Sequence, residues 1–124
     1  MKVLVTGGAG FIGSHVVDRL LQEGHDVVVV DNLVTGKRKN VPKAAQFYKL
    51  DIENPKLERI FRNERPSIVF HLAAQMNVRR SVEDPMFDAQ VNVLGTLNVL
   101  EQASKHGARK VIFSSSGGAI YGEQ

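Results

Sequence analysis

The sequence contains 124 residues, of which 43% are hydrophobic and 23% charged, and its formal net charge is +3. This length suits one compact domain, and the composition is typical of a globular protein. The absence of cysteine excludes disulfides, thiolate metal sites and thiol nucleophiles, and it agrees with the cytoplasmic location that we expect. No apolar run approaches the roughly 20 residues that cross a bilayer, so we expect no membrane partner.

An apolar strand, a glycine-rich turn and a helix open the chain. The strand 3–5 leads into four glycines that satisfy both G-x-G-x-x-G and G-x-x-G-x-x-G: Gly7, Gly8, Gly10 and Gly13. Glycine permits a tight turn, close approach of a pyrophosphate to the main chain, and close packing of helix on strand. The helix N-terminus then offers N–H groups to phosphates. Such glycines alone are a weak signal, but the flanking strand and helix support this interpretation.

The first helix is expected over 11–23, with Gly24 as its C-terminal cap. Its apolar stripe should comprise Phe11, Ile12, Val16, Val17, Leu20 and Leu21. Four consecutive valines at 27–30 then predict a strand that is buried on both faces. A β-branched run without polar alternation is typical of a parallel sheet with helices on each side.

Asp31 lies 18 residues beyond Gly13, at the carboxyl end of the second strand. A carboxylate there accepts hydrogen bonds from ribose hydroxyls and repels a 2′-phosphate, which favours NAD over NADP as the cofactor. The alternative is an Asp that only shapes a turn. The basic run 37–39 keeps NADP as the minor alternative. No aromatic residues interleave with these cations, so we expect a solvated loop over 34–41 and no nucleic-acid partner.

Three further strands are expected at 46–50, 67–72 and 110–114. Helices should run from Asn54-Pro55 to just before Pro66, and from Asp84-Pro85 to about His106. This alternation predicts an α/β fold with a doubly wound parallel sheet of five strands in the order 3-2-1-4-5. Residues 1–124 would form one domain, with its ligand at the carboxyl ends of the strands near the switch between strands 1 and 4.

Polar residues after the later strands are weaker candidates. Asp51, followed by Ile52, accepts from an adenine amino group or simply precedes a helix. His71 is interpreted as a packed core histidine, and without further ligands at suitable spacing we expect no metal. Asn92 needs partners near the cofactor or in solvent. One of the hydroxyls at 114–116 could reach a substrate. From the residues alone we favour the alternative, in which these serines only satisfy turn amides.

Taken together, these motifs resemble the NAD-dependent epimerase/dehydratase family, the extended short-chain dehydrogenases/reductases, which have a Rossmann fold. The matching stretches follow one another as 5–14, 31–36, 51–52, 71–75, 81–85, 92–96 and 114–122. The nearest likeness is to 4-epimerases of nucleotide-sugars, which are isomerases of carbohydrate metabolism. The resemblance implies that bound NAD takes hydride from C4 of a UDP-hexose and returns it to the other face. The alternatives are a nucleotide-sugar 4,6-dehydratase of the same family and a non-catalytic NAD-binding module.

The resemblance also implies roles for single residues. The cofactor contacts would be Gly7, Gly10, Phe11, Ile12, Gly13, Asp31, Asn32, Asp51, Ile52, Leu72, Ala73, Ala74 and Asn92. Ser116 would be the catalytic serine that helps to hold the 4-oxygen.

The family's catalytic Tyr-x-x-x-Lys pair, a sixth strand and the sugar-binding domain are expected beyond Gln124. We therefore expect an incomplete, truncated amino-terminal portion that folds and binds NAD but does not catalyse epimerisation alone. The apolar helix over 84–106 and an uncovered fifth strand predict a homo-oligomer.

Overall fold

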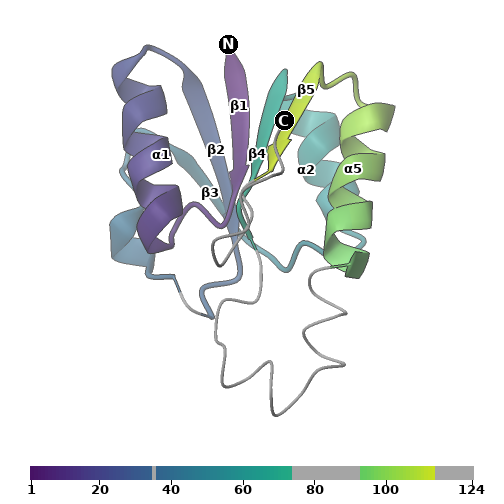
Figure 1. Ribbon diagram of the computed structural model, residues 1–124, viewed down its shortest axis with the longest axis horizontal. Coiled ribbons are helices and arrows are strands. Elements are labelled where there is room, and N and C mark those ends of the chain that lie inside the picture. The colour runs from purple at the N-terminus through teal and green to yellow at the C-terminus, as the bar shows by residue number, and fades with distance from the viewer. Residues whose placement is uncertain (35, 74–92, 114–124) are drawn as a thin grey trace.

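Five parallel strands form one sheet in the computed structural model, which describes residues 1–34, 36–73 and 93–113 (Figure 1). The strands are β1 (Lys2–Thr6), β2 (Asp26–Asp31), β3 (Gln46–Lys49), β4 (Ile68–His71) and β5 (Lys110–Phe113). Their order is β3-β2-β1-β4-β5, which confirms the predicted 3-2-1-4-5 topology. In this order β1 pairs with β2 on one side and β4 on the other, so the switch in strand order falls at the carboxyl end of β1.

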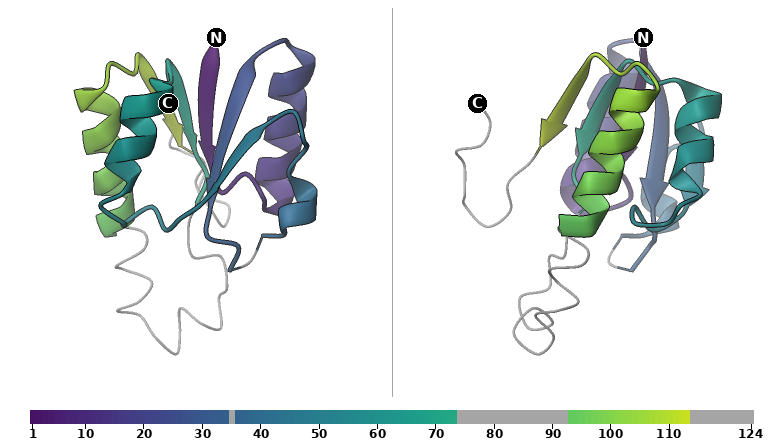
Figure 2. Two further views of the ribbon diagram at one scale, coloured as in Figure 1. Left: turned by 180° about the vertical axis from the view of Figure 1, so that it is seen from behind. Right: turned by 90° about the vertical axis from the view of Figure 1, so that its right-hand side faces the viewer.

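Helices cover both faces of the sheet, which confirms the doubly wound α/β class. α1 (Phe11–Gln22) lies on one face, and α2 (Leu57–Glu64) and α5 (Gly95–Lys105) lie on the other (Figure 2). A short 3₁₀ helix, η1 (Arg38–Asn40), interrupts the loop between β2 and β3. Apart from this single helical turn, the described residues of 34–41 form the loop that was expected there.

The valine run of β2 explains how the sheet is buried on both sides. Val28 and Val30 pack with α2 and α5, whereas Val27 and Val29 pack with α1 through Val17. All four valines are at most 3% exposed. Successive side chains of a strand point to opposite faces, so an uninterrupted apolar strand fills both cores.

Two details of the predicted helices are wrong. Phe11 and Ile12 do not belong to the buried stripe, because they are 78% and 57% exposed in the first turn of α1. α2 begins at Leu57 and not at Asn54-Pro55. Asn54 instead forms a separate turn, in which its side-chain Oδ1 accepts from Lys56 N and its carbonyl accepts from Leu57 N.

The predicted helix over 84–106 is described only from residue 93. Residues 93 and 94 form a wider π-type turn before α5, and the predicted start at Asp84-Pro85 lies outside the described residues. Gly24 and Gly107 follow α1 and α5 with φ of +88° and +80°, as expected for C-terminal caps. Among the helices that the structure describes, none has both the length and the hydropathy needed to span a membrane.

Candidate functional site

The glycine-rich turn leaves the carboxyl end of β1 and is held by main-chain contacts. Gly7 has a φ of +76°, a conformation that favours glycine, and its N–H donates to the Val30 carbonyl at 2.8 Å. Gly10 N–H donates back to the Gly7 carbonyl at 3.2 Å. A Cβ on Gly13 would lie 2.0 Å from the same carbonyl oxygen, so only glycine lets α1 approach the turn this closely. The turn is therefore a rigid main-chain structure.

The N-terminus of α1 opens directly from this turn. Its N-cap residue, Gly10, has no side chain to cap the helix, and the first turn contains no acidic residue. Among the described residues, a Cβ on Gly10 would meet only the Gly7 oxygen, at 3.5 Å. The first N–H groups of a helix lack intrahelical acceptors, and the helix dipole favours an anion beside them. This end of α1 can therefore receive a phosphate group.

Ala9 anchors the middle of the turn to the neighbouring strand and loop. Its N–H donates to Asp31 Oδ2 at 2.9 Å. Its carbonyl accepts from Lys37 N at 3.0 Å and from Asn40 Nδ2 at 2.9 Å. Gly36 packs so closely that a Cβ there would lie 2.8 Å from the Ala9 carbonyl carbon. The loop after β2 therefore braces the glycine turn.

Asp31 is buried at the end of β2, only 8% exposed. Its Oδ1 accepts from Leu33 N at 2.8 Å, while Oδ2 accepts from Ala9. The contact with Leu33 is the hydrogen bond expected of an Asp that only shapes a turn. The contact with Ala9 links the carboxylate to the glycine motif. Asn32 beside it donates through Nδ2 to Asp51 Oδ1 at 2.7 Å, which brings the ends of β2 and β3 together. A carboxylate has about four acceptor positions, so both Asp31 oxygens retain acceptor capacity.

At the end of β4, His71 is buried between two threonines. Its Nδ1 lies 2.8 Å from Thr6 Oγ1, and its Nε2 lies 2.9 Å from Thr96 Oγ1. Thr6 Oγ1 also accepts from the N–H groups of Leu72 and Ala73, at 3.0 and 3.1 Å. Burial lowers the pKa of His71 to about 4, so the ring is neutral near pH 7. The structure thus favours the packed histidine over an acid or base.

Ile52 lies in the core, 6% exposed, and not on an open surface. A Cβ on Gly95 would lie 2.5 Å from Ile52 Cδ1, so the start of α5 packs directly on this side chain. Asn98 donates through Nδ2 to the carbonyls of Ile52, at 2.7 Å, and Asn54, at 3.2 Å. α5 therefore holds the segment after β3, and Asp51 remains exposed next to it.

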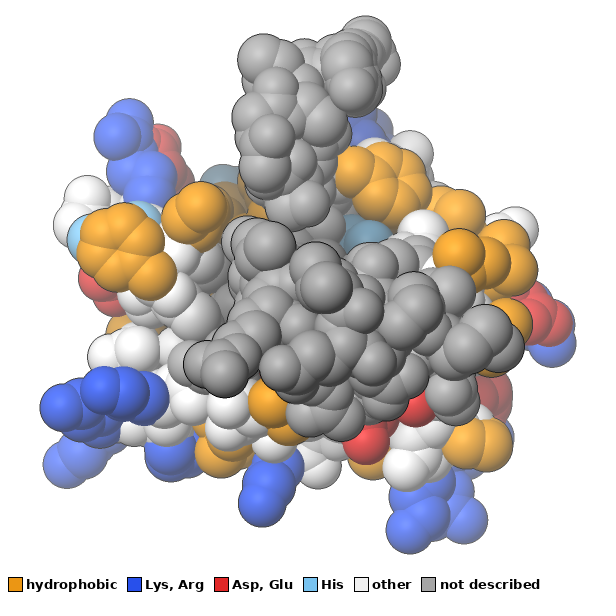
Figure 3. All heavy atoms as spheres, turned by 60° about the horizontal axis from the view of Figure 1, so that its bottom comes forward, with side chains coloured by type: hydrophobic (Ala, Val, Ile, Leu, Met, Phe, Trp, Pro, Cys, Tyr) orange, Lys and Arg blue, Asp and Glu red, His pale blue; other side chains and the backbone are white. Residues whose placement is uncertain are grey.

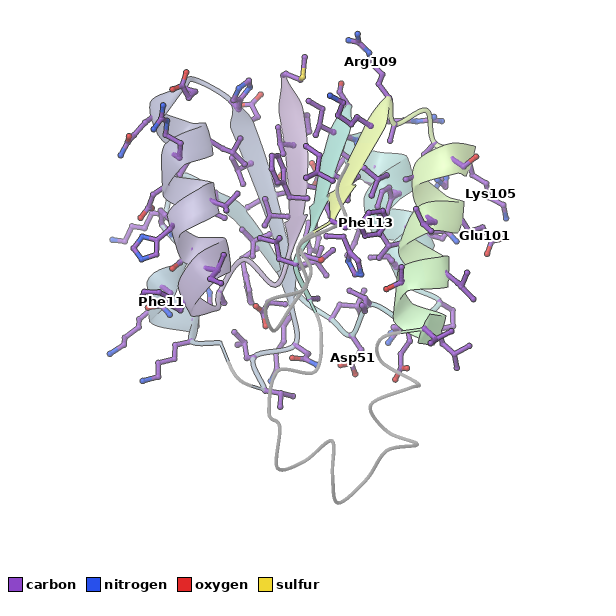
Figure 4. The ribbon with its side chains drawn as sticks, in the orientation of Figure 1. Phe11, Asp51, Glu101, Lys105, Arg109 and Phe113 are labelled. Atoms are coloured by element: carbon purple, nitrogen blue, oxygen red, sulfur yellow. The ribbon has the colours of Figure 1, made fainter. Side chains whose placement is uncertain are left out.

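The structure gathers the described candidates at one edge. Phe11 and Asp51 lie at the end of the molecule where the strands finish, and Arg109 lies at the opposite end (Figure 4). On this face hydrophobic side chains are exposed, with Lys and Arg toward its rim (Figure 3). Arg38, in η1, lies over the Phe47 ring at 4.6 Å. Among the described residues, no group of three His, Asp or Glu side chains could hold a metal ion.

Three candidates lie outside the described residues: Ala74, Asn92 and Ser116. Conversely, sequence reasoning missed Thr6, Thr96 and Asn98, whose side chains support the ends of β1, β3 and β4. The only local signal for Thr6 is a hydroxyl that follows an apolar strand and precedes glycine. Thr96 and Asn98 are two of several polar residues in α5, and their partners are distant in the sequence.

Comparison with known proteins agrees with this geometry. The chain is 50% identical to a putative UDP-glucose 4-epimerase of Methanocaldococcus jannaschii over 121 residues, which are 98% of this chain and 40% of the relative. It superposes on the Thermotoga maritima UDP-glucose 4-epimerase, solved with UDP-glucose, with a TM-score of 0.93 and 56% identity. On the Thermus thermophilus UDP-glucose 4-epimerase, solved with NAD, it superposes with a TM-score of 0.92 and 56% identity. The chain is covered completely in both structures and spans 40% of each.

The chain therefore spans about two fifths of the length of these relatives. Residues 3–124 match the family described as the NAD dependent epimerase/dehydratase family. The predicted resemblance is confirmed, and NAD is confirmed as the cofactor of the family. From the match over nearly its whole length, together with the glycine turn, Asp31 and the strand order, the chain belongs to the NAD-dependent epimerase/dehydratase family.

Proposed function

We propose that this chain is the NAD-binding part of a UDP-hexose 4-epimerase and holds the dinucleotide at the carboxyl edge of its sheet. The observation that carries the proposal is the uncovered main chain at the start of α1 beside the buried Asp31 carboxylate. The relatives named UDP-glucose 4-epimerase, one of them solved with NAD, support it.

The residues present fit a dinucleotide. The N–H groups at the start of α1 suit a diphosphate, and the absence of a Cβ on Gly10 leaves the main chain open to it. Asp31, held by Ala9 and Leu33, suits the hydroxyls of the adenosine ribose. A 2′-phosphate at the same place would meet a carboxylate that is already fixed in position. The geometry therefore favours NAD over NADP.

When bound, NAD would supply the hydride transfer that transiently oxidises C4 of the hexose. The described residues would bind and orient the cofactor. The glycine turn receives the diphosphate, Asp31 and Asn32 contact the ribose, and Asp51 contacts the edge of the adenine. Ser116, Asn92 and Ala74 keep the roles that the resemblance implies as proposals. We also propose that the 124 residues alone bind NAD without interconverting UDP-glucose and UDP-galactose. Epimerisation by the purified 124-residue chain would contradict that last point.

Calorimetric titration of the chain with NAD and with NADP tests the proposed cofactor site. We expect NAD to bind, and NADP to bind at least about tenfold more weakly because its extra phosphate faces Asp31. Gly10→Ala should weaken NAD binding while the urea midpoint stays the same, since the new methyl group has room in the free chain. Gln22→Ala, at the exposed far end of α1, is the matched control. A folded chain that binds no NAD would contradict the proposal.

We propose further that the chain forms homo-oligomers through α5. The helix and the turn before it expose four apolar side chains: Val93 (54%), Leu94 (53%), Leu97 (57%) and Leu100 (37%). Exposed apolar side chains gathered on one element favour association. Sedimentation should show an oligomer that Leu97→Lys dissociates and Gln22→Lys, on α1, does not. A monomeric parent chain at tens of micromolar would contradict this proposal.

A further inference from the structure

A hydroxyl–imidazole–hydroxyl chain crosses the point where the strand order switches. It joins Thr6 on β1, His71 on β4 and Thr96 on α5 through contacts of 2.8 and 2.9 Å. Thr6 is fully buried and His71 is 5% exposed. Thr6 Oγ1 also receives the N–H groups of Leu72 and Ala73. One buried oxygen is therefore shared by the ends of two neighbouring strands.

The contacts around Thr6 assign the protons of the chain. A hydroxyl oxygen has two lone pairs and one proton. Leu72 N–H and Ala73 N–H both point at this oxygen, so its own proton has to go to His71 Nδ1. A protonated Nδ1 would bring a third N–H donor to the same oxygen. His71 is therefore the neutral Nε2–H tautomer, and it donates to Thr96 Oγ1.

The backbone that Thr6 holds lies directly against the glycine turn. A Cβ on Gly7 would lie 2.8 Å from Ala73 N and 2.9 Å from the Leu72 carbonyl carbon. Leu72 N–H also donates to a second acceptor, the Thr6 carbonyl, at 3.1 Å. For Ala73 N–H, the Thr6 hydroxyl is the one acceptor within the described part of the chain. The position of this segment over Gly7 thus depends on the hydroxyl.

We propose that Thr6 and His71 are positioning residues: the neutral Nε2–H imidazole orients the Thr6 hydroxyl, and that hydroxyl keeps residues 72 and 73 seated on the glycine turn. Thr96 completes the chain and couples the arrangement to α5. The part of this inference that concerns the dinucleotide rests on the proposed function, since residues 72 and 73 are expected cofactor contacts. The tautomer and the backbone contact do not depend on it.

The surroundings of the imidazole suit a fixed neutral ring. Among the described residues its hydrogen-bond partners are the two hydroxyls, and the Phe113 ring stands nearly perpendicular to it, with centroids 5.8 Å apart. None of these groups carries a charge that would stabilise an imidazolium. Burial lowers the pKa of His71 to about 4, in agreement with the proton assignment from the hydrogen bonds.

The first test reads the tautomer by long-range ¹H–¹⁵N NMR of the ¹⁵N-labelled 124-residue chain near pH 7. We expect His71 to show a protonated Nε2 and a bare Nδ1. The exposed His15 serves as an internal control. A protonated Nδ1, or titration of His71 near the ordinary histidine value, would overturn the inference whether or not the chain binds NAD.

The second test compares Thr6→Val, which removes the hydroxyl, with Thr6→Ser, which retains it. Amide hydrogen exchange at Ala73 should accelerate in Thr6→Val and stay near the parent rate in Thr6→Ser. NAD affinity should fall about tenfold in Thr6→Val, because a buried donor loses its acceptor, and recover in Thr6→Ser. If Thr6→Val does not fold, Thr96→Val removes instead the acceptor of His71 Nε2–H, and Thr96→Ser retains it. Exchange at Ala73 should again accelerate only in the valine variant, because the imidazole then no longer orients the Thr6 hydroxyl.

The possible failures are distinguishable. If the parent chain binds no NAD, the proposed function fails, and exchange at Ala73 still decides the positioning role. A second outcome is that the parent chain binds NAD while the valine and serine variants show equal amide exchange at Ala73 and equal NAD affinity. In that case the positioning role fails and the proposed function stands.

Discussion

Gly13 lies so close to Gly7 that a Cβ on Gly13 would be 2.0 Å from the Gly7 carbonyl oxygen. The nearby atoms are main-chain atoms, which cannot rotate away as a flexible side chain could. The same contact is what brings the start of α1 against the turn after β1. Gly13 therefore supports the fold directly, in addition to any role toward a ligand.

Gly13→Ala should lower the free energy of unfolding by about 1–3 kcal/mol or more, because the added methyl group forces α1 away from the turn. Urea unfolding of the variant and the parent measures the difference. Gly10→Ala is the matched control, since its Cβ would meet the Gly7 oxygen at an ordinary 3.5 Å and no other atom of the described part of the chain within 4 Å. Equal stability of the two variants would contradict the packing argument.

Asp31→Ala should destabilise the chain in the absence of any ligand, by about 1–3 kcal/mol, because the N–H groups of Ala9 and Leu33 lose their carboxylate acceptors. Thermal and urea unfolding without NAD give the measurement. Asn32→Ala is the neighbouring control and should cost less, since its contacts to Val34 and Asp51 are exposed. If Asp31→Ala is as stable as the parent, the carboxylate does not hold the turn.

Stability should depend on pH through His71. Its pKa is about 4 in the folded chain against 6.5 for a free histidine, so between these values the unfolded chain binds more protons. The folded state should therefore lose stability as the pH falls from about 6.5 to about 4, by about 3 kcal/mol in total. Urea midpoints across this range check it, and His71→Gln should flatten the dependence. A parent stability profile that is flat over the same pH range would show that His71 is protonated as easily in the folded chain as in the unfolded chain.

Glu64→Gln should destabilise the end of the sheet opposite to the candidate site. Glu64 accepts from Lys2 Nζ at 2.8 Å and from Tyr48 OH at 2.5 Å. Burial opposes its ionisation, but these two hydrogen bonds together with the charge of Lys2 outweigh the burial and hold the pKa of Glu64 below its ordinary value. The hydrogen bond to Glu64 raises the pKa of Tyr48. We expect a loss of about 1–3 kcal/mol at pH 7, because charge-assisted hydrogen bonds disappear.

The pH dependence gives a second check on Glu64. Because its pKa is lowered on folding, its contribution is complete above the ordinary value of 4.5 and is lost as the pH falls through the lower folded value. Glu101→Gln is the control: its pair with Lys105 is exposed along α5 (Figure 4), and it should cost at most about 0.5 kcal/mol. Equal losses in both variants at pH 7 would contradict the proposed role of Glu64.

Two local patterns in the sequence did not predict the structure that forms at their positions. Ile12 has the spacing of a core residue, but it lies in the first turn of α1 and is 57% exposed. Asn54 and Pro55 have the signature of a helix start, but Asn54 closes a turn of its own before Leu57. Both patterns are local, and neither reports where the neighbouring elements end.

The sequence by itself determined the alternation of strands and helices, the strand order, the glycine turn and the position of Asp31 after β2. These features follow from local preferences: β-branched runs, helical periodicity, and backbone conformations that only glycine adopts easily. The tertiary structure alone decided the partners of the buried polar groups. Thr6 meets His71 across 65 residues and Asn98 meets the Ile52 carbonyl across 46, because β1 is paired with β4 and α5 packs against α2, β4 and the Ile52 side chain. Such contacts depend on which elements become neighbours, and no local pattern contains that information.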